Sequence, residues 1–141
     1  MADWVDLTRG IALPRYCDHY GHMNVRYYAQ FFDDAGWHIL NLAGIAFEDI
    51  QDRGLGTVVV NVSIDFHHEL VQGKLFVIRG GYTRVGTKSF HHELRLYEAD
   101  TMTHCATQTS VEVFFDTKAR KAVEIPDDLK EKMAARVVAA D

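Results

Sequence analysis

The spacing of hydrophobic and polar residues changes along this chain from that of a strand to that of a helix and back. Apolar residues alternate from Val5 to Leu13, which predicts a β-strand. Between Val25 and Ala43 they recur at the i, i+3, i+4, i+7 spacing of one helix face. We therefore expect a helix over residues 25–43, roughly 28 Å long. Asn24 is suited to cap its start and Gly44 to end it.

The rest of the chain predicts β-structure as far as about residue 116, after a helical turn around residues 47–52. Four alternating segments are separated by turn-forming residues, and each places one set of residues on one face. These sets are Val58, Val60, Val62, Ile64 and Phe66; Phe76, Ile78 and Tyr82; Phe90, His92, Leu94 and Leu96; and Cys105, Thr107, Thr109, Val111, Val113 and Phe115. Consecutive strands joined by tight turns predict an antiparallel meander. The segment 126–138 predicts a short closing helix.

This order of elements indicates the α+β class. The apolar stripe of one long helix needs one apolar sheet face to cover it, and a curved antiparallel sheet wrapped around a central helix provides that face. The chain has 141 residues, of which 48% are hydrophobic and 25% charged, enough for one compact core but not for two. We expect residues 1–141 to form a single domain in which a five-stranded sheet encloses one long helix.

Charge and composition exclude several classes of function. The formal net charge is -5 and the isoelectric point is near 5.9, whereas a surface that binds nucleic acid needs concentrated Lys and Arg. No apolar run approaches the roughly 20 residues of a membrane-spanning helix, and the first residues lack the apolar core of a signal peptide. Cys17 and Cys105 have no metal-ligand spacing, and we do not expect a disulfide between them. We expect a cytoplasmic protein that binds neither nucleic acid nor membranes.

The loop before the predicted long helix combines several groups that carry chemistry, namely Asp18, His19, His22 and Asn24. The first amides of a helix lack intrahelical partners and, together with the helix dipole, stabilise a negative oxygen such as the oxyanion of a reacting thioester. A carboxylate nearby can attack a carbonyl or deprotonate a water. The same residue types also form turns and caps, so the pattern by itself leaves a purely structural role open.

The run RYCDHYGHMNVRYY at residues 15–28 makes this loop recognisable. It resembles the signature of the 4-hydroxybenzoyl-CoA thioesterase-like branch of the hotdog superfamily, in which an Asp and two further residues precede Gly-His-(Val/Met)-Asn and a Tyr opens the helix. The resemblance continues in Phe31–Ala35, Ile64–Phe66 and Lys88–Phe90 and spans nearly the whole chain. It implies the hotdog fold and the hydrolysis of an acyl-CoA thioester.

The resemblance also implies roles for individual residues. Asp18 matches the family's catalytic carboxylate, as general base or nucleophile, and the backbone N–H of Val25 matches its oxyanion donor. The positions that contact the substrate correspond to His22, Asn24, Tyr28, Lys88 and Ser89, the last two near the path of CoA. Many members carry a further Asp two residues before the catalytic one, where this chain has Tyr16, so a neighbouring like charge is missing here. No metal or redox cofactor is expected, and CoA enters as part of the substrate.

Other arrangements of reactive side chains are weaker. The pairs His67-His68 and His91-His92 lie on predicted strands, where adjacent residues point to opposite faces, so neither pair can chelate one metal ion. Ser89 lacks the G-x-S-x-G turn of a nucleophilic serine. A thiolate at Cys17 is disfavoured by the adjacent Asp18 carboxylate.

Two other functions occur on a similar fold. A hydratase or dehydratase of acyl-CoA carries the pattern D-x-N-P-x-H, whereas His22 follows Asp18 by only four residues and no Asn-Pro is present. A non-catalytic acyl-thioester binding protein is expected to have lost the carboxylate.

The partners implied are an acyl-CoA substrate and further copies of the chain. Open sheet edges need protection, and similar hotdog proteins pair their sheets edge to edge with active sites at the interface, so we expect a homodimer or a homotetramer (a dimer of dimers). Trp37, His38 and Leu40 lie at the margin of the helix stripe. We expect them to close an acyl pocket, to contact a second subunit, or to pack beneath the sheet rim.

Overall fold

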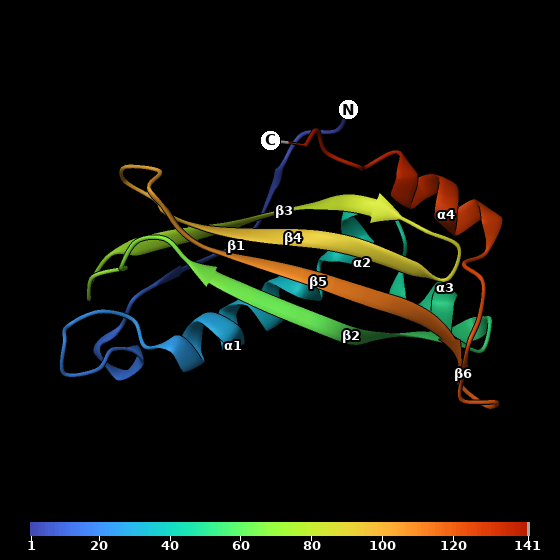
Figure 1. The fold of residues 1–141 in the computed structure, drawn as a ribbon, viewed down its shortest axis with the longest axis horizontal. Coiled ribbons are helices and arrows are strands. Elements are labelled where there is room, and N and C mark those ends of the chain that lie inside the picture. Colours follow the sequence, from blue (N-terminus) through green and yellow to red (C-terminus); the bar gives the residue numbers. More distant parts are fainter. Residues whose placement is uncertain (141) are drawn as a thin grey trace.

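The computed structural model describes residues 1–140. Its elements are β1 (Val5–Ile11), a 3-10 turn η1 (Pro14–Tyr16), α1 (Val25–Gly36), α2 (Ile39–Leu42), α3 (Phe47–Asp52), β2 (Leu55–Phe66), β3 (Leu75–Val85), β4 (Ser89–Glu98), β5 (His104–Asp116), β6 (Lys121–Ala122) and α4 (Asp127–Ala134). Figure 1 shows the strands as one long, curved sheet with α1 and α2 running along one side of it. The predicted α+β class and the curved antiparallel sheet around a helix are confirmed.

The strand order is β1-β3-β4-β5-β2, and every neighbouring pair is antiparallel. β3, β4 and β5 form the predicted meander, but β2 pairs with β5 and not with β3, so the prediction of one meander through all four strands was wrong. The segment 67–74 instead crosses the end of the sheet from one side to the other. The predicted five strands become six, because the short β6 pairs with the end of β5.

The helix predicted over residues 25–43 begins at the expected residue but is interrupted. α1 ends at Gly36, and α2 restarts at Ile39. Glycine has a weak helix propensity, which favours an interruption at this position. Ile39 and Ala43 are nevertheless buried, so the apolar spacing persists across the break. Gly44 ends the helical region as predicted, with φ +77°.

The predicted face of β2 is divided by a register shift between Val59 and Asn61. One extra residue reverses the alternation of side chains along a strand. Val58 therefore lies on the opposite face from Val62, and the prediction that both share one face was wrong. β2 is also an edge strand, where Val60 remains 57% exposed.

The predicted face of β5, made of the odd-numbered residues 105–115, is wrong from Gln108 onward. Gln108, Ser110 and Phe114 are the buried residues in this part of the strand. Ser110 pairs in register with His92 of β4, which is also buried. Because the inward residues here are mostly polar, hydrophobic alternation selects the other face.

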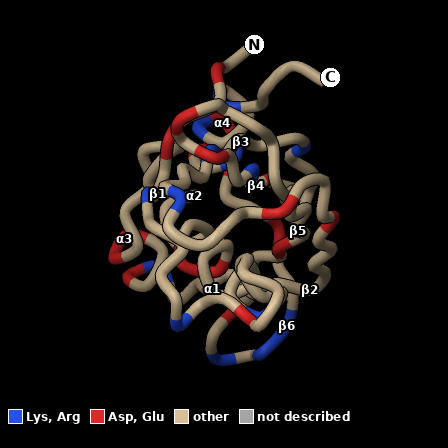
Figure 2. Tube along the Cα trace, turned by 90° about the vertical axis from the view of Figure 1, so that its left-hand side faces the viewer, with Lys and Arg blue, Asp and Glu red and all other residues tan. Residues whose placement is uncertain are grey.

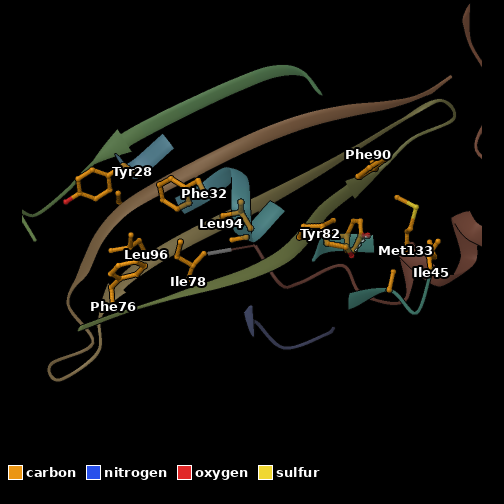
Figure 3. Packing of buried hydrophobic residues seen from close by; sticks show 14 of the residues in the cluster. Tyr28, Phe32, Ile45, Phe76, Ile78, Tyr82, Phe90, Leu94, Leu96 and Met133 are labelled. Carbon is orange, nitrogen blue, oxygen red and sulfur yellow. Dashed lines mark hydrogen bonds between the residues drawn. The ribbon is translucent and has the colours of Figure 1, made fainter. Parts of the chain in front are cut away.

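The core fills the space between the concave face of the sheet and the helices (Figure 3). Phe32 of α1 and Leu94 of β4 are fully buried. Met133 of α4 belongs to the same cluster. Tyr82 of β3 is also fully buried, and its hydroxyl donates to the carbonyl of Ile39 at 2.7 Å, which ties α2 to the sheet.

The closing helix is shorter than the predicted segment 126–138. α4 ends at Ala134, and Val137 and Val138 leave it to form isolated bridges with Tyr82 and Ala2. The two ends of the chain thus meet on the sheet beside β3, as Figure 1 shows.

Charged residues of both signs are dispersed along the trace (Figure 2). The basic residues Lys118, Arg120 and Lys121 are grouped at the turn that leads into β6. Among residues 1–140, no helix combines the length and the apolar character needed to cross a membrane.

Candidate active site

The loop before α1 is closed by its own backbone. Cys17 and Met23 form an isolated antiparallel bridge, and the amide of Asp18 donates to the carbonyl of His22 at 3.3 Å. The amide of Gly21 donates to the carbonyl of Asp18 at 3.0 Å. Gly21 has φ +83°, a conformation that glycine adopts without steric strain. The loop is therefore a tight turn that presents Asp18 at the surface.

This loop also binds the segment that follows β2. The amide of Met23 donates to the carbonyl of Leu70 at 2.9 Å. His22 Nε2 lies 3.5 Å from Glu69 Oε2, with both side chains partly exposed. These contacts fix the predicted site loop beside the end of β2.

The Asp18 carboxylate accepts two hydrogen bonds. The backbone N–H of Tyr20 donates to Oδ1 at 2.9 Å, and the side-chain amide of Asn24 donates to Oδ2 at 3.1 Å. The bond from Asn24, followed by the bond from Tyr20, lowers the pKa of Asp18 below its usual 3.8. The carboxylate is therefore ionised at neutral pH and accessible to solvent, as a general base or a nucleophile must be.

The start of α1 lies directly beside this carboxylate. Asn24 caps the helix, because its Oδ1 accepts the backbone N–H of Arg26 at 3.2 Å. Val25 is the first helical residue, and its N–H has no acceptor within the described residues. Asn24 thus connects the start of the helix to Asp18, because it is hydrogen-bonded to both.

A cavity of about 370 Å³ opens beside the helix start, and His22, Val25, Tyr28 and Phe66 are among its lining residues. The ring of Tyr28 packs edge-on against that of Phe66 at 5.1 Å. Burial raises the pKa of Tyr28 to about 12, so its phenol stays neutral. Tyr28 therefore forms part of the cavity wall and not an ionised group.

Lys88 and Ser89 lie far from this cavity within the same chain. Ser89 pairs in register with Val113, which pairs with Val58 of β2. Phe66, beside the helix start, is at the other end of β2. At about 3.3 Å per strand residue the separation is roughly 25 Å. One chain does not bring the predicted CoA-contacting residues to Asp18.

A larger cavity, of about 640 Å³, lies between the sheet and the end of α1. Phe32, Trp37, Leu40 and Phe47 line its helical side. Of the three residues at the helix margin, Trp37 and Leu40 line this cavity, and His38 is not among its lining residues. The volume falls within the range of pockets that hold small molecules, roughly 300–1,000 Å³.

The sheet side of this larger cavity carries polar residues that the sequence reasoning missed. His92, Gln108 and Glu112 line it. His92 Nε2 lies 2.6 Å from Glu112 Oε2, and the side-chain amide of Gln108 donates to Ser110 Oγ at 3.1 Å. The signal that could have revealed them is the polar residue at every second position from 108 to 112.

The remaining reactive side chains form no second centre. Residues 1–140 contain no group of three or more His, Cys, Asp and Glu side chains placed to hold a metal ion. Cys17 and Cys105 are both free thiols. Burial and then the charge of Asp18 raise the pKa of Cys17, which disfavours its thiolate as predicted.

Comparison with known proteins gives matches to one family and to many solved structures. A family model described as the thioesterase-like superfamily matches residues 12–133. A probable thioesterase from Escherichia coli superposes with a TM-score of 0.81 and 24% identity, covering 93% of this chain and 98% of that one. A protein from Pseudomonas aeruginosa strain PAO1 superposes with a TM-score of 0.79 and 25% identity, covering 98% of this chain and 95% of that one. A Staphylococcus aureus protein in complex with CoA superposes with a TM-score of 0.85 and 15% identity, covering 100% of this chain and 90% of that one. No curated protein matches the chain.

Proposed function

We propose that this chain, which belongs to the thioesterase-like superfamily, hydrolyses an acyl-CoA thioester to the free acid and CoA. The observation that carries the proposal is the ionised Asp18 carboxylate, held by Asn24 beside a helix start whose first amide has no acceptor among residues 1–140. The run at residues 15–28 favours the 4-hydroxybenzoyl-CoA thioesterase-like branch. The Staphylococcus aureus protein of similar fold was solved in complex with CoA, which supports CoA as the thiol part of the substrate.

The proposed reaction uses few groups. The thioester carbonyl oxygen accepts the N–H of Val25, which stabilises the negative charge that develops on that oxygen. Asp18 takes a proton from a water whose oxygen attacks the carbonyl carbon, or Asp18 attacks that carbon itself to form an anhydride that water then opens. In either case the carbon–sulfur bond breaks and the thiol of CoA leaves. The scheme needs no metal or redox cofactor.

A second copy of the chain would complete this site. β2 is an edge strand with an unpaired row of backbone groups, and Val59 and Val60 are about half exposed. Antiparallel pairing of two β2 strands would place the Ser89 end of one chain near the Phe66 end of the other. Lys88 and Ser89 could then reach CoA bound at the partner's helix start, which supports a homodimer or a dimer of dimers.

The principal test is thiol release from a panel of acyl-CoAs, from aromatic to long-chain, by the native protein and by Asp18→Asn. Removal of the charge at Asp18 should lower kcat/KM by roughly 10²- to 10⁴-fold. Asp100→Asn changes an exposed carboxylate in the β4–β5 turn and is the matched control, with activity unchanged. An Asp18→Asn protein as active as the control would refute the proposal.

Single-turnover hydrolysis in oxygen-18 water tests for the anhydride. Label in the Asp18 carboxylate means that an anhydride formed there and was opened by water attack on the aspartyl carbonyl. Absence of label after one complete turnover excludes that route and leaves general-base catalysis or opening of the anhydride at its substrate carbonyl.

A further inference from the structure

The larger cavity has two chemically different sides. Its helical side is largely apolar, although Asp33 and Asn41 also line it, and β2 adds Val62 and Ile64. His92, Gln108 and Glu112 form its sheet side, which we call the polar floor. The side chain of His92 is 2% exposed and that of Glu112 is 13% exposed, so these groups are removed from bulk solvent.

The polar floor has hydrogen-bonding capacity that the chain does not use. A carboxylate accepts hydrogen bonds, so the 2.6 Å contact with Glu112 assigns a proton to Nε2 of His92. Nδ1 is buried without a partner among the described residues, and it accepts or donates according to the protonation of the ring. The Glu112 carboxylate accepts one bond at Oε2 and keeps further lone pairs.

Unused acceptors beside apolar walls favour a particular kind of ligand. Buried polar groups are destabilising unless they are hydrogen-bonded, and a ligand that carries a donor removes this penalty. A carboxylate on the ligand would be repelled by Glu112. An ammonium would be attracted by Glu112, but the loss of its hydration between apolar walls can exceed that gain. An uncharged hydroxyl both donates and accepts hydrogen bonds and has neither disadvantage.

The polar floor and the proposed catalytic group Asp18 lie at different positions along α1. Tyr28 and Phe66 line the small cavity at the helix start, while Ala29 and Ile64, their close neighbours on the same elements, line the larger one. An acyl chain bound with its carbonyl at the start of α1 therefore has the larger cavity ahead of it along α1 and β2.

We infer that His92 and Glu112 determine specificity by selecting an acyl group that carries a hydroxyl away from the thioester. This inference rests on the proposed thioesterase function. His92 and Glu112 contact the distal part of the acyl group, and Asp18 acts on its carbonyl. The preference should amount to roughly tenfold to a hundredfold in kcat/KM over the same acyl group without the hydroxyl, as expected for one hydrogen bond to a charged or buried polar group.

The experiment compares dodecanoyl-CoA with 3-hydroxy-, 8-hydroxy- and 12-hydroxydodecanoyl-CoA on the native protein. The 8-hydroxy or the 12-hydroxy member should exceed the parent about tenfold in kcat/KM, whereas the 3-hydroxy member, whose hydroxyl lies beside the thioester, should not. Hydrolysis of all four within twofold of one another overturns the inference but leaves the thioesterase proposal intact. If the protein hydrolyses neither these four substrates nor any other acyl-CoA, the thioesterase proposal itself is overturned.

Matched variants locate the preference. His92→Phe should bring the ratio of kcat/KM for the hydroxylated substrate to that for the plain substrate close to one. His91→Phe alters the adjacent residue, whose side chain points to the opposite face of β4, and should keep the native ratio. Equal ratios in the two variants would contradict the inference.

A direct binding measurement does not depend on the His92→Phe protein folding. In the native protein, the imidazole nitrogens of His92 should change their nitrogen-15 shifts when the preferred hydroxy acid is added, but much less with dodecanoic acid. Glu112→Gln keeps the volume of the side chain and should weaken that response. Identical shifts with both acids would refute the role of His92.

Discussion

Asn24 is hydrogen-bonded both to the helix and to the carboxylate, and two substitutions can separate these interactions. Its Oδ1 accepts the N–H of Arg26 at 3.2 Å, and its Nδ2 donates to Asp18 at 3.1 Å. Serine at this position retains an oxygen that caps a helix but lacks the longer amide that reaches Asp18. Alanine lacks both. Asn24→Ser should therefore affect only the carboxylate, and Asn24→Ala should affect the carboxylate and the stability of the fold.

The expected magnitudes differ for the two properties. Loss of an N-cap lowers the free energy of unfolding by about 1 kcal/mol, within a range of about 0.5 to 2, whereas serine caps about as well as asparagine. In a chain of this size that corresponds to a Tm lower by roughly 2–7 °C for Asn24→Ala and nearly unchanged for Asn24→Ser. The bond from Asn24 is the largest cause that lowers the pKa of Asp18, so both variants should raise that pKa towards 3.8.

The sign of the pH dependence follows from the reactive form of the carboxylate. Hydrolysis needs ionised Asp18, so native activity should fall only as the pH drops through the lowered pKa. In both variants this decline should begin at a higher pH. Carbon-13 titration of the Asp18 side chain reports the same pKa without any substrate.

Thermal unfolding at one fixed protein concentration, with the titration and the pH profile of kcat/KM, completes the comparison. The reasoning would be refuted if Asn24→Ser lowered Tm as much as Asn24→Ala. It would also be refuted if the pKa of Asp18 stayed at its native value in both variants.

Two further predictions concern stability. Tyr82→Phe removes the buried hydroxyl that donates to the Ile39 carbonyl at 2.7 Å and should lower the free energy of urea unfolding by about 1–3 kcal/mol. The control is Tyr97→Phe, at a less buried tyrosine, which should change that free energy by less than about 0.5 kcal/mol. Equal losses in the two variants would count against the bond to Ile39. Arg53 lowers the pKa of Asp128 to about 2, so the stability that this pair contributes is present above pH 3.8 and is lost as the pH falls towards 2. When unfolding is followed from pH 5 to pH 2, the stability of Arg53→Gln should therefore depend less on pH than that of the native protein. Identical profiles would contradict this.

Local structure around the site could be predicted from the sequence because neighbouring residues determine it. Asn24 caps the helix that begins at Val25, and Gly21 takes the positive φ that closes the loop carrying Asp18. Each of these features depends on residues within one turn of the chain. The same is true of Gly44, which ends the helical region.

Pairing between distant strands could not be predicted in this way. The tight turns after β3 and β4 predict their pairings, but β2 pairs with β5 across about 50 residues and contains a one-residue shift at Val59–Asn61. Hydrophobic alternation gives no position for such a shift, so the predicted face of β2 is wrong on one side of it. The separation of Lys88 and Ser89 from Asp18 follows from the same pairings.

The polar floor was missed for a different reason. Alternation identifies a buried face by its apolar residues, and in β5 the buried face carries Gln108 and Ser110. A polar residue inside a protein is retained where another group satisfies it. The part of β5 whose buried face was predicted wrongly is therefore also the part that lines the larger cavity.

The two ends of α1 border different cavities. α1 begins at Val25 beside Asp18 and ends at Gly36, which lines the larger cavity. A Cβ atom at Gly36 would meet only Leu94 Cδ1, at the ordinary contact distance of 3.9 Å, so close packing does not require glycine there. An added side chain would instead extend into the cavity. The proposed acyl-binding space can thus be altered near Gly36 while the loop and amide of the proposed site stay unchanged, because they lie at opposite ends of α1.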